Sequence, residues 1–226
     1  MGDQALIVEF GERIDPALSA YIAAIARRLR DSLPIGVFDI VPAYSTLALH
    51  YDPAAVGAGS SPYEALAEII GTWLKTQSVD AAPAGRLVEI PVCYGGTFGE
   101  DLETLARNRR LSVDEAIAIH SGTPSHVHML GFVPGFAYLG GLDARLETPR
   151  RDTPRARIPA GSVGIGGEQT GVYPLETPGG WQIIGRTPLP LFAPDAVPPC
   201  LLNAGDTVRF VPISAQEFEA WARSAG

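Results

Sequence analysis

Lysine is almost absent from this chain of 226 residues. Of its 17 basic residues only Lys75 is a lysine, and the others are arginines. A Walker-type phosphate loop needs a Gly-Lys-Ser or Gly-Lys-Thr run, and none occurs in the sequence. Covalent attachment of biotin and Schiff-base chemistry also need a lysine, and Lys75 stands at the polar end of a predicted helix. Any phosphate or carboxylate is therefore expected to be bound by arginine, by backbone N–H groups or by a partner.

Positive charge and long apolar runs are also scarce. The formal net charge is −8 at neutral pH, which argues against a nucleic-acid partner, because such proteins usually carry a basic stripe. No apolar stretch approaches the roughly 20 residues that span a bilayer, so no membrane association is expected. The first residues carry an acid at Asp3 and no basic region before an apolar run, which does not fit a signal peptide.

Cysteine is limited to Cys93 and Cys200. Their spacing is not that of metal ligands, and a protein of this size does not need a disulfide to fold, so a reduced, cytoplasmic protein is expected. His126 and His128 would share one face of a strand. Because no third ligand is evident near them, no metal site is predicted in this chain.

The periodicity of apolar residues predicts two domains. The first, residues 1–80, is expected to contain strands at 5–10, 37–41 and 46–51 and helices that begin at 15–16 and 61–62. This order favours a two-layer α+β domain whose helices cover one face of a small antiparallel sheet. Residues 80–85, with the sequence DAAPAG, form a predicted linker to the second domain, residues 86–226.

The second domain is expected to be a mainly-β barrel. Its centre, Gly131 to Arg186, is rich in glycine and proline but also carries Phe136, Tyr173 and Trp181, which a disordered linker would lack. Short apolar runs between its turns predict short strands in a closed or nearly closed β-structure whose loops hold a site. Around this centre we expect strands at 87–94, 126–131 and 207–212. We also expect helices at 101–110 and 217–223, and a further helix that begins at the Ser112–Glu115 capping box.

Four arginines lie within eight positions of the loop before the PAGSVGIGG segment: Arg150, Arg151, Arg155 and Arg157. Their guanidinium groups would repel one another unless an anion lies among them, and arginine can form two hydrogen bonds with one carboxylate or phosphate. The alternative is a solvated loop whose arginines pair with neighbouring acids, namely Asp143, Glu147 and Asp152. Both interpretations remain open from the sequence.

Polar groups near the glycine-rich segment are candidates for substrate binding. The glycines could present backbone N–H groups to an anion, or could only allow positive φ at barrel corners. Ser162, Gln169 and Gln182 can hydrogen-bond an amide or a carboxylate. His120 and His128 flank the GFVPGF segment and could act as a base or a hydrogen-bonding group, although a structural role is the safer expectation. Ser162 lacks the G-x-S-x-G context of a serine hydrolase.

Five segments carry a resemblance to a known family: GDQALIVEFG, DIVPAYSTLALHYDP, LGFVPGFAYLGGL, PRRDTPRARIPAGSVGIGG and YPLETPGGWQIIGRTP. The chain resembles the family of bacterial 5-oxoprolinase B subunits, also called allophanate hydrolase subunit 1 or the Kip inhibitor family. It is also similar to part of the carboxyltransferase domain of urea carboxylase. The resemblance covers essentially the whole chain and implies an N-terminal α+β domain followed by a cyclophilin-like β-barrel.

The resemblance implies one component of an ATP-dependent assembly that opens 5-oxo-L-proline to L-glutamate. Its partners would be a homologous barrel protein, the C subunit of 5-oxoprolinase, and the separate A subunit. A lactam resists water, so ATP is expected to activate its carbonyl oxygen, with the nucleotide shared with the partners. On this hypothesis the anions are held by Arg155 and Arg157, and the 162–167 turn, with Gly164 and Gly166, donates backbone hydrogen bonds. The remaining substrate contacts are expected from His128, Ser162, Gln169 and Gln182.

Two alternative functions stay open. The Kip inhibitor name implies a binding module that inhibits a sensor histidine kinase, for which no catalytic residue is required. The likeness to urea carboxylase implies a carboxyltransferase or allophanate hydrolase type of protein in urea metabolism, with carboxybiotin supplied elsewhere. A barrel related to cyclophilins would not establish prolyl isomerase activity, because fold and function separate readily.

Overall fold

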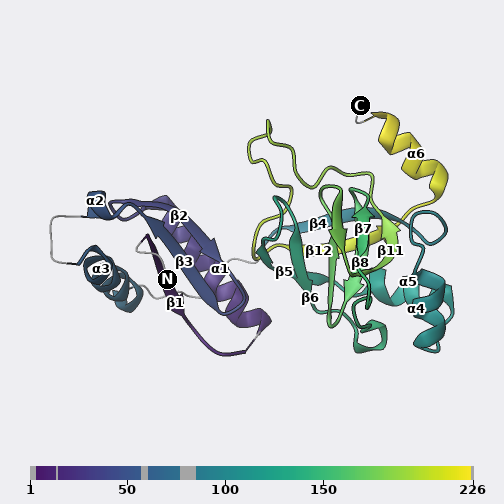
Figure 1. Ribbon diagram of the computed structural model, residues 1–226, viewed down its shortest axis with the longest axis horizontal. Helices are drawn as coiled ribbons and strands as arrows, with labels where there is room; N and C mark the ends of the chain where they lie inside the picture. Colours follow the sequence, from purple (N-terminus) through teal and green to yellow (C-terminus); the bar gives the residue numbers. More distant parts are fainter. Residues whose placement is uncertain (1–3, 14, 57–60, 77–84, 225–226) are drawn as a thin grey trace. The chain divides into compact units, whose positions relative to one another are not determined.

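A computed structural model of the chain describes residues 4–13, 15–56, 61–76 and 85–224. The chain divides into two compact units, Met1–Ala84 and Gly85–Gly226 (Figure 1). The predicted linker at 80–85 lies outside the described residues, apart from Gly85.

The first unit is a three-stranded antiparallel sheet with helices. Its strands lie in the order β1-β3-β2. Along β3, Leu47, Leu49 and Tyr51 are buried and alternate with partly exposed residues, so one face of the sheet meets the core to which the helices contribute. The elements are β1 (Ala5–Glu9), α1 (Pro16–Asp31), β2 (Val37–Pro42), β3 (Thr46–Tyr51), the short α2 (Pro53–Val56), which the sequence did not predict, and α3 (Pro62–Thr76).

Helix α1 begins as its sequence predicts. The Asp15 carboxylate accepts hydrogen bonds from the backbone N–H groups of Ala17 and Leu18, at 2.7 and 3.2 Å, and Pro16 occupies the first helical position. A cap of this kind satisfies N–H groups that have no partner within the helix. Ile22, Ile25 and Leu29 then fall on one face and are completely buried.

The second unit is built on a closed barrel of seven strands in the order β11-β4-β12-β5-β6-β9-β8, which confirms the predicted barrel (Figure 1). Strands β4 and β12 are parallel, and the other neighbours are antiparallel. A separate ribbon pairs β7 with β10. The barrel strands are β4 (Leu87–Tyr94), β5 (Ser125–Leu130), β6 (Ala137–Gly140), β8 (Ser162–Gly166), β9 (Gln169–Val172), β11 (Gln182–Arg186) and β12 (Thr207–Pro212), and the ribbon strands are β7 (Arg155–Ile158) and β10 (Thr177–Gly179).

Helices pack beside the barrel and share its core. Helix α4 (Leu102–Asn108) contributes Leu102 and Leu105, and α5 (Val113–Gly122) contributes Ala116. The predicted capping box is present, because the Ser112 hydroxyl accepts from Glu115 N and the Glu115 carboxylate accepts from Ser112 N. The unit also contains a 3-10 turn, η1 (Ala144–Leu146), and a last helix, α6 (Ala215–Ser224).

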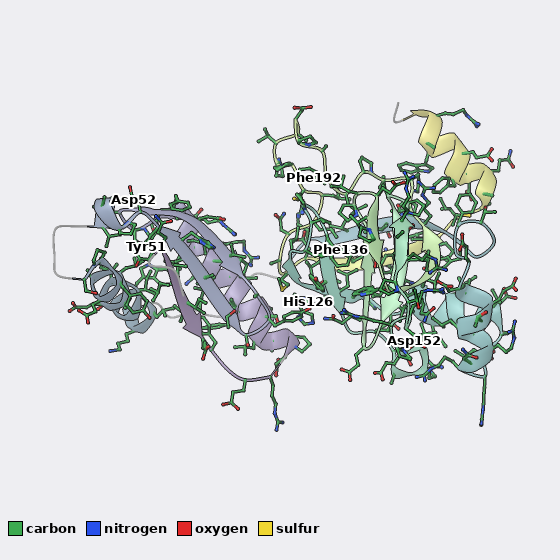
Figure 2. The ribbon with its side chains drawn as sticks, in the orientation of Figure 1. Tyr51, Asp52, His126, Phe136, Asp152 and Phe192 are labelled. Atoms are coloured by element: carbon green, nitrogen blue, oxygen red, sulfur yellow. The ribbon has the colours of Figure 1, made fainter. Side chains whose placement is uncertain are left out.

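The glycines of β8 and β9 make room for an aromatic cluster. A Cβ at Gly166 would lie 2.7 Å from the Trp181 ring, and one at Gly171 would lie 3.0 Å from it. Trp181 also contacts the rings of Phe136 and Tyr173 edge-on, and Phe136 is drawn among the barrel strands in Figure 2. These glycines therefore serve packing, since any side chain would displace the indole.

Candidate functional site

A surface pocket opens beside the ribbon strand β7 and the barrel strands β8 and β11. Its lining includes Arg155 and Arg157 from β7, Ser162 from β8 and Arg186 from β11. Its volume is about 390 Å³, counting the space open to solvent. The pocket therefore combines half of the predicted arginine cluster with one predicted hydroxyl and one arginine that the sequence analysis did not single out.

Arg155 is paired with a carboxylate that belongs to the fold. Its Nη1 and Nη2 groups donate to the two Asp101 oxygens at 2.8 Å each, and Nη2 also donates to Glu100 at 3.3 Å. Asp101 is only 8% exposed and also accepts a hydrogen bond from Ile183 N at 2.6 Å. The hydrogen bonds with Asp101 raise the pKa of Arg155 above its ordinary value. This arginine therefore ties β7 to the start of α4 and to the β11 strand.

Arg157 lies at the outer rim of the pocket. Its Nε and Nη2 groups donate to Glu176 Oε1 at 2.8 and 2.5 Å. The Arg157 side chain is 78% exposed, so water competes with this pair and its contribution to folding is small. Arg157 can consequently exchange its carboxylate partner for a ligand at little cost.

The other two arginines of the cluster face internal partners. The Arg150 guanidinium lies 5.8 Å from the centre of the Trp181 ring, a distance at which the cation and the ring attract each other. Arg151 donates to Asp101 at 3.2 Å. The alternative interpretation, in which neighbouring acids neutralise the cluster, is wrong for Asp143, which pairs with Arg145. The partners come instead from distant parts of the chain.

Arg186 ends β11 directly opposite Ser162 of β8. Its Nε group donates to the backbone carbonyl of Ala160 at 2.8 Å. The Ser162 residue is 2% exposed. In the sequence, Arg186 stands out only as the last residue of the GGWQIIGR segment. No sequence pattern indicates that the end of this strand lies beside the arginine loop.

The prediction that residues 162–167 form an anion-binding turn is wrong for most of this segment. Residues Ser162–Gly166 form β8, which pairs with β9 on one edge and with β11 on the other. Their peptide groups therefore belong to the barrel and are not free to cradle an anion. Only Gly167, with φ +68°, adopts a left-handed turn conformation. Gly164 and Gly166 face Trp181, which explains them by packing alone.

The two predicted glutamines lie at the other end of the same strands. Gln182 is opposite Ile165 and Gln169 is opposite Gly166. With a rise of about 3.3 Å per residue, the four steps from Ser162 to Gly166 span roughly 13 Å. Gln182 Nε2 donates to the backbone carbonyl of Pro149 at 3.1 Å, so it supports the arginine loop rather than the pocket.

His128 is separated from the pocket by the barrel itself. It lies on β5, and two strands, β6 and β9, stand between β5 and β8 on one side. Figure 2 shows its neighbour His126 on one side of the barrel and Asp152, within the arginine loop, on the other. Burial, together with the nearby His126, lowers the pKa of His128 to about 4. Because of this placement, we do not expect His128 to contact a ligand in this pocket.

His120 belongs to a buried polar chain in the barrel. Its Nδ1 lies 2.7 Å from the Tyr94 hydroxyl and its Nε2 lies 2.9 Å from Thr170 Oγ1. Thr170 donates its single proton to the Gly164 carbonyl at 3.0 Å, so Nε2 must donate to Thr170 and Nδ1 must accept from Tyr94. Burial lowers the pKa of His120 to about 3 and raises that of Tyr94. His120 is therefore a neutral, hydrogen-bonded structural group.

The described residues contain neither a metal-binding cluster nor a membrane-spanning helix. Within residues 4–13, 15–56, 61–76 and 85–224, no cluster of three or more histidine, cysteine or acidic side chains is arranged to hold a metal ion. Over the same ranges, no helix combines the length and the apolar character that crossing a membrane requires.

Comparison with known proteins gives consistent results. The family "Carboxyltransferase domain, subdomain C and D" matches residues 1–202. The chain is 45% identical to the 5-oxoprolinase B subunit of Bacillus subtilis (strain 168) over 226 residues, which covers 98% of this chain and 94% of that protein. It is 42% identical to the 5-oxoprolinase B subunit of Escherichia coli O157:H7 over 212 residues, or 94% of each protein.

A solved structure extends the likeness to three dimensions. The structure of TTHA0988 matches with a TM-score of 0.81 and 35% identity over 94% of this chain. This chain corresponds to 40% of TTHA0988, so that protein contains a large further part. Identity of this degree over nearly the whole length of two curated relatives, together with the shared fold, shows that the chain belongs to the family of 5-oxoprolinase B subunits.

Proposed function

We propose that this chain is one component of an ATP-dependent 5-oxoprolinase that opens 5-oxo-L-proline to L-glutamate. The observation that carries the proposal is the 45% identity to a 5-oxoprolinase B subunit over nearly the full length of both proteins. The name of that relative implies other subunits, and we propose a homologous barrel protein, the C subunit, and the A subunit as partners. The arginine-lined pocket supports the proposal, because the proposed substrate is an anion.

The reaction constrains what the protein must provide. Ring opening adds one water across the lactam C–N bond and produces the second carboxylate and the amino group of glutamate, while hydrolysis of ATP to ADP and phosphate consumes a second water. ATP supplies phosphoryl activation of the amide oxygen, which resonance otherwise makes unreactive. The protein must hold an acidic substrate in a fixed position and offset negative charge that develops at the amide oxygen.

The pocket fits the substrate better than it fits the nucleotide. Arg157 and Arg186 bring positive charge to a cavity that is partly walled by apolar side chains, including Phe98 and Ile183. The sequence contains no phosphate-loop lysine. We therefore propose that the partner proteins supply most of the ATP contacts and complete the site, and that the isolated chain does not turn over.

Reconstitution from purified components tests this function. The co-purified assembly should form glutamate from 5-oxo-L-proline only when ATP is present, with one ADP released for each glutamate. The isolated chain, tested under the same conditions, should form none. Glutamate formation without ATP, or an assembly that hydrolyses a different amide and leaves 5-oxo-L-proline intact, would refute the proposal.

A urea-type carboxyltransferase is the second candidate, and the match to a carboxyltransferase family favours it. Such an activity needs carboxybiotin carried elsewhere in the assembly, because this chain has no suitable lysine context. Avidin added to the assembly separates the two functions. It should abolish a biotin-dependent transfer to urea and should leave ATP-driven opening of 5-oxo-L-proline unchanged.

A further inference from the structure

The three arginines that line the pocket differ in how their charge is balanced. Arg155 forms two hydrogen bonds with Asp101, and Arg157 pairs with Glu176. Arg186 takes part in none of the ion pairs found in the part of the chain that the structure describes. A half-buried cation without a carboxylate is unfavourable unless an anion from outside occupies the place beside it.

The Arg186 side chain is held in one direction. Its Nε group donates to the Ala160 carbonyl, and no further hydrogen bond of the guanidinium falls within the described residues. The carbonyl stands in a fixed turn, because Gly161 has φ +81° and a Cβ there would lie 2.3 Å from Thr187 O. The Thr187 N–H also donates to the Gly161 carbonyl at 2.9 Å. The two terminal nitrogens of Arg186 thus remain available for a ligand.

A hydroxyl lies beside this cation. Ser162 is directly opposite Arg186 on the neighbouring antiparallel strand, and directly opposite side chains point to the same face with their Cβ atoms about 5 Å apart. Both residues line the pocket. The Ser162 residue is only 2% exposed, but its hydroxyl oxygen is not among the fully buried side-chain atoms that lack a hydrogen-bond partner in the described part of the chain. A hydroxyl that lines a pocket in this way can donate a hydrogen bond to a ligand.

Apolar side chains complete the pocket. Phe98, Ile158 and Ile183 line it next to the polar pair. A ligand that fits must therefore carry a compact negative group at one end and an apolar body at the other. A small organic carboxylate has this character, whereas inorganic phosphate or sulfate would leave the apolar wall uncovered.

We propose that Arg186 and Ser162 form the carboxylate-binding subsite of the pocket, with Arg186 donating two hydrogen bonds to the carboxylate and Ser162 donating one. Applied to the proposed function, on which this last step rests, the ligand is the carboxylate of 5-oxo-L-proline. Its ring then lies against Phe98 and Ile183. Arg155, which is already neutralised by Asp101, holds the architecture, and Arg157 at the rim adds charge that attracts the anion.

Binding to the purified full-length chain tests the subsite without reference to turnover. Isothermal titration with 5-oxo-L-proline should give saturable binding, and Arg186→Gln should weaken it by about tenfold or more, as expected for a lost charged hydrogen-bond pair. Arg186→Lys keeps the positive charge but cannot form two parallel hydrogen bonds with one carboxylate, so it should recover only part of the affinity. Ser162→Ala should weaken binding less. Arg209→Gln is the matched control, because Arg209 is also a barrel-strand arginine but pairs with Glu89 outside the pocket.

The outcomes separate this subsite from the proposed function. Unchanged binding by Arg186→Gln, with a circular dichroism spectrum and Tm like those of Arg209→Gln, would overturn the subsite. The same holds if phosphate and sulfate bind as tightly as 5-oxo-L-proline. If the chain binds 2-pyrrolidone, which lacks the carboxylate, as well as it binds 5-oxo-L-proline, the subsite is also refuted. If Arg186-dependent binding of small carboxylates persists while the assembly forms no glutamate, the subsite stands and the proposed function fails.

Discussion

Arg155 and Asp101 form a two-pronged ion pair between segments that are 54 positions apart, with both nitrogen-to-oxygen distances at 2.8 Å. The Asp101 carboxylate also accepts from the Ile183 backbone and from Arg151. One carboxylate therefore joins α4, the arginine loop and β11, and two of its partners, Arg155 and Ile183, line the pocket.

Asp101→Asn should destabilise the second unit by about 3 kcal/mol, because an amide cannot balance the two arginines that face it in a largely buried place. Urea unfolding followed by tryptophan fluorescence measures this change. Asp143→Asn is the control, since Asp143 pairs with Arg145 at the surface and its loss should hardly move the midpoint. Equal midpoints for the two variants would show that Asp101 does not hold the loop.

Arg157→Gln should separate function from stability. Its ion pair with Glu176 is exposed, so the Tm should shift by less than about 2 °C. If Arg157 attracts the anionic substrate, glutamate formation by the assembly should fall and the loss should be larger at low salt. Glu176→Gln leaves the arginine in place and should retain activity. Full activity of Arg157→Gln at every salt concentration would remove this residue from the site.

The His120 chain predicts one tautomer. Because Thr170 gives its only proton to the Gly164 carbonyl, the ring must carry its proton on Nε2. Long-range nitrogen-proton correlation spectra should show the Nε2–H form with Nδ1 unprotonated. Thr170→Val removes the acceptor and should cost about 1 to 3 kcal/mol, since it leaves a buried N–H without a partner. An Nδ1–H ring in the unaltered protein contradicts this hydrogen-bond order.

Acidification should weaken the fold before the carboxylates titrate. The pKa values of His120 and His128 are lowered to about 3 and about 4 by burial, whereas an unfolded histidine titrates near 6.5. Below about pH 6.5 the unfolded state binds more protons, so stability falls with pH, by up to about 1.4 kcal/mol per pH unit for each histidine. Urea midpoints measured at pH 7.5, 6 and 5 should decrease in that order. A midpoint independent of pH over this range would mean that both rings are solvated.

Gly166→Ala should be far more harmful than a similar change elsewhere. Its new Cβ would lie 2.7 Å from the Trp181 ring, and overpacking of this kind costs about 1 to 3 kcal/mol. Gly122→Ala is the matched control, because nothing lies within 4 Å of its added Cβ and the residue is helical. Tryptophan fluorescence should report the displaced indole in the first variant only. An unchanged spectrum and midpoint in Gly166→Ala would contradict the packing role.

Much of the secondary structure follows from signals between residues that are close in sequence. The Asp15 cap, the Ser112–Glu115 box and the alternation along β3 involve neighbours, so they act before the chain is folded and can be predicted from spacing. The family-specific segments likewise identified the barrel. The separate β7–β10 ribbon was not predicted, because its strands are short and carry no periodic apolar pattern.

The composition of the chain by itself determined that no phosphate-loop lysine is present, so that anions are left to arginine, backbone N–H groups or a partner, and that the glycine-rich centre is a packed β-structure. Only the tertiary structure decided which arginines remain available. Asp101 neutralises Arg155 from far along the chain, and Arg186 meets Ser162 because β11 and β8 close the barrel side by side. Ion pairing depends on distance in space, so residues with the same charge and the same sequence context can be structural supports or ligand-binding groups.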